Sequence, residues 1–103
     1  MNIVILITAP NSKEARKIAD ALVNNKLAAC VNIVERIGSV FLWNKKIEKA
    51  KEVLLIAKSK KVKFPKIVKL VKRLHSYQVP EIIALPIIDG YKPYLRWIDD
   101  SLR

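Results

Sequence analysis

Two long apolar segments in the middle of the chain constrain its fold more than any other feature. Leu27–Trp43 and Ile47–Ser59 are rich in β-branched and large apolar residues, and Asn44–Lys46 between them has turn character. They predict a long β-hairpin, bent or bulged near Gly38, where the missing side chain relaxes the backbone. Its apolar centre, Val53–Ala57, is too hydrophobic to be left in water. We therefore expect the protein to work as an oligomer.

The segments that flank the hairpin complete an alternating pattern of strands and helices. In chain order we expect a strand over Asn2–Ala9, a helix over Ser12–Val23, the hairpin, a helix from about Pro65 to His75, a strand over Ile82–Ile88 and a helix over Pro93–Leu102. Asn11 is the expected N-cap of the first helix, with Glu14 in the capping-box position.

This order, β-α-β-β-α-β, predicts an α+β fold of the ferredoxin-like class. Both helices would cover one face of an antiparallel sheet. The long hairpin joins the second and third strands, and the extra C-terminal helix together with a partner subunit would cover the second face.

Length and composition indicate one domain over residues 1–103 in a globular protein. The longest apolar runs fall far short of the roughly 18–20 residues that span a bilayer, so we expect no membrane partner. No cation precedes the first apolar run, which argues against a signal peptide. Cys30 is the only cysteine, which excludes an internal disulfide, and we expect a cytoplasmic location.

The net charge of +11 is unevenly distributed, because no acid lies between Glu52 and Glu81. The cations of the Lys58–Arg73 segment could form a polyanion-binding surface or simply a solvated helix face. Apart from Phe64, no aromatic residue is interleaved with them to stack on bases, so we favour the solvated face and do not expect nucleic acid as a partner.

Motifs for catalysis are absent: the chain has no glycine-rich phosphate loop, CxxC, HExxH or GxSxG sequence. Since no nucleophile pairs with an activating base, we expect no enzyme. His75 could be a soft-metal ligand or pH-sensitive group with Glu81 in reach, or a histidine that interacts with the helix end. Cys30 is interpreted as an inert core thiol. Trp43 and Trp97 suit packing or a subunit interface.

Several strings, taken together and in order, resemble the CutA divalent-cation tolerance family over essentially the whole chain. They are Thr8-Ala9-Pro10, Leu27-Ala28-Ala29-Cys30-Val31-Asn32, Trp43 with Ile47, Glu52-Val53, Lys58, His75-Ser76-Tyr77-Gln78-Val79-Pro80-Glu81-Ile82 and Tyr94-Leu95-Arg96-Trp97.

The resemblance implies a ferredoxin-like homotrimer joined through its hairpins, with a cytoplasmic role in tolerance to copper and other divalent cations. The copper-ligand positions proposed for bacterial members match Ile7, Leu74 and His75, of which only His75 can coordinate a metal. We therefore expect His75 with Glu81 as possible ligands of a divalent metal such as copper.

As an alternative hypothesis, the resembling residues Trp43, Lys58, His75, Tyr77 and Glu81 line a cleft between subunits, where a lysine, a histidine and a tyrosine would suit a small anion or a weakly held metal. Cys30, Asn32, Pro80, Tyr94 and Trp97 belong to the family's structural motifs. Two other functions stay open: a trimeric signalling module like the PII proteins that binds a small anionic effector, and polyanion binding through Lys58–Arg73.

Overall fold

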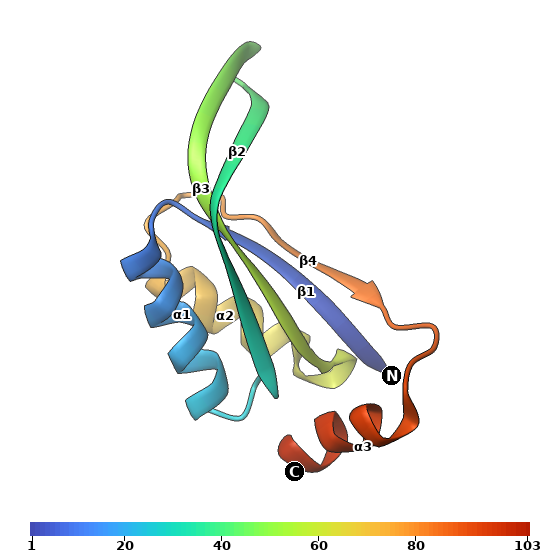
Figure 1. Ribbon diagram of the computed structural model, residues 1–103. Coiled ribbons are helices and arrows are strands. Elements are labelled where there is room, and N and C mark those ends of the chain that lie inside the picture. Colours follow the sequence, from blue (N-terminus) through green and yellow to red (C-terminus); the bar gives the residue numbers. More distant parts are fainter.

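The computed structural model describes all residues from 1 to 103 and has the expected order of elements (Figure 1). The elements are β1 (Asn2–Ala9), α1 (Ser12–Asn24), β2 (Cys30–Trp43), β3 (Lys46–Lys60), the 3-10 turn η1 (Lys61–Lys63), α2 (Phe64–Leu74), β4 (Ile82–Pro86) and α3 (Lys92–Ser101). The α+β class, the ferredoxin-like arrangement and the long β2–β3 hairpin are thus confirmed.

The sheet has the strand order β2-β3-β1-β4, and every neighbouring pair is antiparallel. Alternate residues of the central strands, such as Ile5 on β1 and Leu55 on β3, are fully buried beneath α1 and α2. These helices contribute Ile18, Leu22 and Ile67 to the same core. The two helices lie together on one side of the sheet, and α3 crosses near the first residue of β1 (Figure 1).

The first helix begins as its sequence predicts, but its capping box is only half formed. The Asn11 side chain accepts a hydrogen bond from the Glu14 backbone N–H at 2.8 Å. The Glu14 carboxylate does not return to the cap. It accepts hydrogen bonds from the backbone N–H and the hydroxyl of Ser76, at 3.0 and 3.1 Å, and so ties α1 to the segment after α2.

The hairpin contains the expected bulge near Gly38, although Gly38 itself is not the bulged residue. Gly38 pairs regularly with Lys51 and has no positive φ, whereas the register shifts between Val34 and Ile37. Arg36 takes the left-handed conformation with φ of 61°. The preceding Glu35 forms a 2.9 Å ion pair with Arg16 of α1. The extra residue is therefore accommodated where the strand passes α1, and not where the sequence has glycine.

Two strands are shorter than expected. The second begins at Cys30 because Leu27 and Ala28 instead bond through their backbone N–H groups to the Leu22 carbonyl, which closes the end of α1. The last strand ends at Pro86, and Ile88 is 94 % exposed. The hairpin turn uses Asn44 and Lys45, whose φ angles of 52° and 65° are those of a type I′ turn.

The face of the sheet opposite α1 and α2 is apolar and largely uncovered. We call it the open face; it consists of Val4, Leu6, Val34, Leu54, Ile56, Ile83 and Leu85. Ile83 and Leu85 are both 48 % exposed, and the outer hairpin adds the exposed Phe41 and Trp43 on the same side. The hairpin projects beyond the helices (Figure 1), so the radius of gyration is 14.1 Å against about 13 Å for a compact chain of this length. None of the helices is long and apolar enough to cross a membrane.

Candidate functional site

His75 lies at the C-terminal end of α2 and is buried among the elements that it joins. Its Nε2 lies 2.7 Å from the Thr8 carbonyl oxygen, and its Nδ1 lies 3.1 Å from the Tyr77 backbone nitrogen. A carbonyl can only accept and a backbone N–H can only donate, so Nε2 carries the proton and Nδ1 accepts. Both ring nitrogens are therefore engaged within the chain, and His75 fixes the segment after α2 to the end of β1.

These contacts do not fit the copper site that the resemblance implies. A metal ion on either His75 nitrogen would displace one of its hydrogen bonds, and Ile7 beside it on β1 is fully buried. Glu81, the other expected ligand, lines a cavity to which His75 does not contribute. Nowhere in the chain do three or more His, Cys, Asp or Glu side chains gather in a way that could hold a metal ion.

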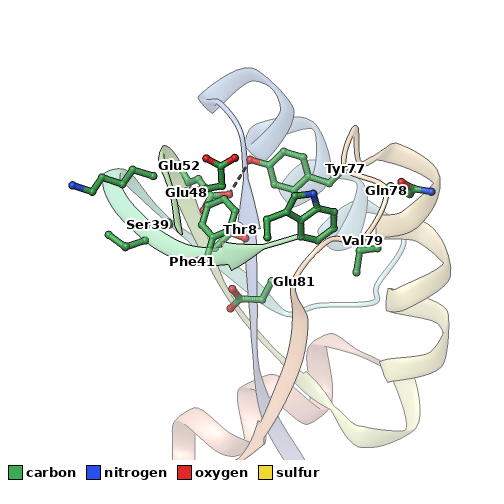
Figure 2. A pocket seen from close by; sticks show the side chains of 12 residues that line it. Thr8, Ser39, Phe41, Glu48, Glu52, Tyr77, Gln78, Val79 and Glu81 are labelled. Atoms are coloured by element: carbon green, nitrogen blue, oxygen red, sulfur yellow. Dashed lines mark hydrogen bonds between the residues drawn. The ribbon is translucent and has the colours of Figure 1, made fainter. Parts of the chain in front are cut away.

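A cavity beside Glu81 has a volume of about 750 Å³. Its walls come from the outer hairpin, the end of β1 and the loop between α2 and β4 (Figure 2). The lining residues are Thr8, Ser39, Val40, Phe41, Trp43, Glu48, Lys49, Glu52, Tyr77, Gln78, Val79 and Glu81.

A buried carboxylate and a tyrosine meet at the inner end of this cavity. Glu52 of β3 is only 8 % exposed, and its Oε2 accepts a 2.9 Å hydrogen bond from the Tyr77 hydroxyl (Figure 2). Burial raises the pKa of Tyr77 to about 12, with further contributions from the hydrogen bond to Glu52 and from the charges of Glu52 and Glu14. Tyr77 is consequently a neutral hydrogen-bond donor at neutral pH. Its ring also packs against His75, with ring centroids 4.8 Å apart.

The cavity is acidic although the chain is strongly basic. Glu48, Glu52 and Glu81 line it, three of the nine acids in a protein of net charge +11, and Lys49 is the only cation in its wall. Figure 2 shows the Glu81 carboxylate well apart from that of Glu52. The negative charge is therefore spread over the wall and does not converge on one point.

The bulge decides which side chains of the outer hairpin face this cavity. Before the bulge, Val34 pairs with Leu54, and after it Phe41 pairs with Glu48. The extra residue shifts the alternation of β2 by one, so Phe41 joins the even-numbered side chains of β3, including Glu48 and Glu52, on one side. No sequence motif signals this arrangement directly, and Phe41, Glu48 and Glu52 were not among the expected site residues.

The expected cleft residues are only partly brought together. Trp43 and Tyr77 line the same cavity, but Lys58 does not. It lies on the sheet beside Asn32, whose side-chain oxygen accepts a hydrogen bond from the Lys58 ammonium.

The other motif residues lie at the opposite end of the sheet or in the connecting loop. Cys30 is half-buried and not part of the core, so its interpretation as a core thiol is wrong. Burial raises the pKa of Tyr94, and Cys30 adds to that shift. Tyr94 packs against Trp97, with ring centroids 5.4 Å apart, and Pro80 lies in the loop before β4.

The cations of α2 point to solvent as the sequence suggested. Lys66, Lys69, Lys72 and Arg73 are exposed, and none of them takes part in an ion pair.

Comparisons with known proteins find one family and several solved structures that are similar to this chain. The family model described as CutA1 divalent ion tolerance protein matches residues 3–101. The divalent-cation tolerance protein CutA of Thermus thermophilus is 46% identical over 98% of both chains, and its solved structure superposes with a TM-score of 0.96. The CutA protein of Archaeoglobus fulgidus is 47% identical over the whole of both chains, also with a TM-score of 0.96. Human protein CutA is 44% identical over 89% of this chain and 51% of its own length.

Proposed function

The chain belongs to the CutA1 divalent ion tolerance family, and from this premise we propose that it acts in cation tolerance as a cytoplasmic homotrimer with a ligand cavity at each subunit seam. The proposed activity is binding of a ligand and not catalysis. Among the hydroxyl groups of the cavity wall, only that of Tyr77 is hydrogen-bonded to a carboxylate, and its high pKa makes it a donor and not a nucleophile.

The open face is the observation that carries the proposed assembly. Val34 is 41 % exposed and Ile83 and Leu85 are each 48 % exposed on one continuous surface, and the outer hairpin adds Phe41 and Trp43 at 42 % and 49 % on the same side. Soluble monomers rarely expose a contiguous apolar surface of this kind. β2 is in addition a 14-residue edge strand whose outer hydrogen-bonding groups are unpaired. The number of three copies comes from the family resemblance.

The exposure of the hairpin residues supports a cavity at the interface between two subunits. Phe41 and Trp43 line the cavity, yet they are 42 % and 49 % exposed. They belong to the part of the hairpin that projects furthest from the subunit body (Figure 1). A neighbouring copy packed on the hairpin would close the cavity on its open side.

A cation is the ligand that the wall charges favour, since three carboxylates face one lysine. A divalent ion would need donors from a neighbouring copy, because the donors of one chain do not converge. Carboxylate oxygens suit Mg²⁺, Ca²⁺ or Mn²⁺ better than copper.

Native mass spectrometry tests the assembly. We expect a species with three times the 11.8 kDa mass of the chain. Ile83→Lys, which places a charge on the open face, should shift the protein to monomers or smaller species. Val62→Lys is the matched control, because Val62 is an apolar residue 77 % exposed on η1, away from that face. A wild-type monomer, or equal behaviour of the two variants with both retaining native circular dichroism, would contradict the proposal.

Calorimetric titration tests the cation separately. Mn²⁺ should bind to the wild type and lose affinity in Glu52→Gln, while copper binding should not depend on His75. Loss of copper binding in a folded His75→Gln variant would restore His75 as a ligand.

A further inference from the structure

We propose that the cavity binds an organic ammonium ion, with the charged nitrogen near Glu52 and its alkyl part against the aromatic wall. The assignment rests on the cavity proposed above and adds a ligand class to it.

The first support is the electrostatic state of Glu52. This residue is only 8 % exposed, yet no lysine, arginine or histidine lies within ion-pair distance of its carboxylate. Its only side-chain hydrogen bond is the one from Tyr77, so its second oxygen has no donor in the chain and is open to solvent, since no fully buried side-chain oxygen lacks a partner. A buried charge without a counter-charge is costly, and a cation in the cavity would supply the missing partner.

The second support is the size of the cavity and the spacing of its acids. A volume of about 750 Å³ is typical of sites for small organic molecules and far exceeds the space of one water, about 30 Å³. The three carboxylates do not gather around a single point. An extended molecule with one or two ammonium groups can reach separated carboxylates, whereas one ion cannot.

The third support is the aromatic wall, which metal binding would not require. Phe41, Trp43 and Tyr77 all line the cavity, and Val79 adds an apolar surface. Aromatic faces attract ammonium groups, and they also pack against methylene groups. The bulge at Arg36 puts Phe41 on the same side as Glu48 and Glu52, so acidic and aromatic groups share one surface.

Isothermal titration of the full-length protein with 1,4-diaminobutane tests the proposal. The uncharged isostere 1,4-butanediol is the ligand control. Glu52→Gln should weaken diamine binding about tenfold or more, because it removes the buried charge. Trp43→Leu should weaken it about three- to tenfold without affecting Mn²⁺. Asp100→Asn is the control variant, since Asp100 is an exposed acid on α3, and it should bind like the wild type.

The outcomes separate the ligand class from the proposed function. No diamine heat, equal binding of the diol, or an unchanged affinity in both Glu52→Gln and Trp43→Leu would overturn the organic-cation assignment. If trimers and Mn²⁺ binding persist in that case, the proposed function stands. If Glu52→Gln does not fold, the variants Glu81→Gln and Trp43→Leu replace it in the titration. Both must then lower the affinity for the diamine.

Discussion

The hydrogen bond between Tyr77 and Glu52 provides a quantitative test of the cavity. Tyr77→Phe removes the only donor to the Glu52 side chain and leaves an 8 % exposed carboxylate without a donor in the chain. Hydrogen bonds to charged groups contribute about 1.5–3 kcal/mol, and we expect a loss of this size in the free energy of unfolding. At about 4–8 °C per kcal/mol for a domain of this length, the thermal midpoint should fall visibly.

The same substitution should cost less when position 52 is neutral. In a Glu52→Gln background the Tyr77 hydroxyl can donate only to a neutral amide oxygen, a bond that contributes about 0.5–1.5 kcal/mol. The double-mutant cycle should therefore give a coupling energy of about 1–2 kcal/mol.

Guanidinium unfolding of the four proteins, followed by tryptophan fluorescence, measures the cycle. All samples need one protein concentration, because assembly would otherwise contribute to the apparent stability. Tyr91→Phe is the matched control, since Tyr91 is 78 % exposed and its hydroxyl forms no hydrogen bond within the chain; it should change stability by less than about 0.5 kcal/mol. If Tyr77→Phe costs the same in the wild-type background as in the Glu52→Gln background, the carboxylate and the hydroxyl do not interact as described.

Three further outcomes follow from other contacts. Because the pKa of Tyr77 is raised from its ordinary 10 to about 12, its contribution to stability is complete below pH 10 and is lost as the pH rises through 12. Thermal melts across this pH range should therefore show a smaller loss of stability at alkaline pH in Tyr77→Phe than in wild type. Lys45→Gly should raise the thermal midpoint by the equivalent of about 0.5–1 kcal/mol, since Lys45 has a φ of 65° in a type I′ turn that favours Asn-Gly, and a lower midpoint would count against this turn geometry. Leu55→Ala should cost about 2–5 kcal/mol in denaturant unfolding, because Leu55 is fully buried on β3; a loss below about 1 kcal/mol would show that the core is not packed there.

The features that sequence predicted well are those determined by neighbouring residues. The order of elements follows from the spacing of apolar residues, and the Asn11 cap depends only on a residue three positions away. The turn at Asn44 and the proline near the start of α2 are equally local.

The features that sequence left undetermined depend on pairing across the fold. The bulge was expected near Gly38, but that its left-handed residue is Arg36, next to the Glu35 that contacts Arg16 of α1, could not be read from neighbouring residues. The resemblance places Lys58 in a cleft between subunits, and within one chain the strand register puts it beside Asn32, outside the cavity lined by Trp43 and Tyr77. The cavity joins Glu52 to Tyr77, which are 25 positions apart, and only the path of the loop after α2 brings them together.

The projecting hairpin also has a consequence for how the protein is made. A newly synthesised chain has no other copy to cover its apolar arm, and β2 presents an open edge during that interval. Encounter with other copies then competes with irregular strand addition, so the yield of native protein should depend on how fast chains are supplied. If the hairpin joins subunits as proposed, the same arm is the segment most exposed to misassembly during synthesis.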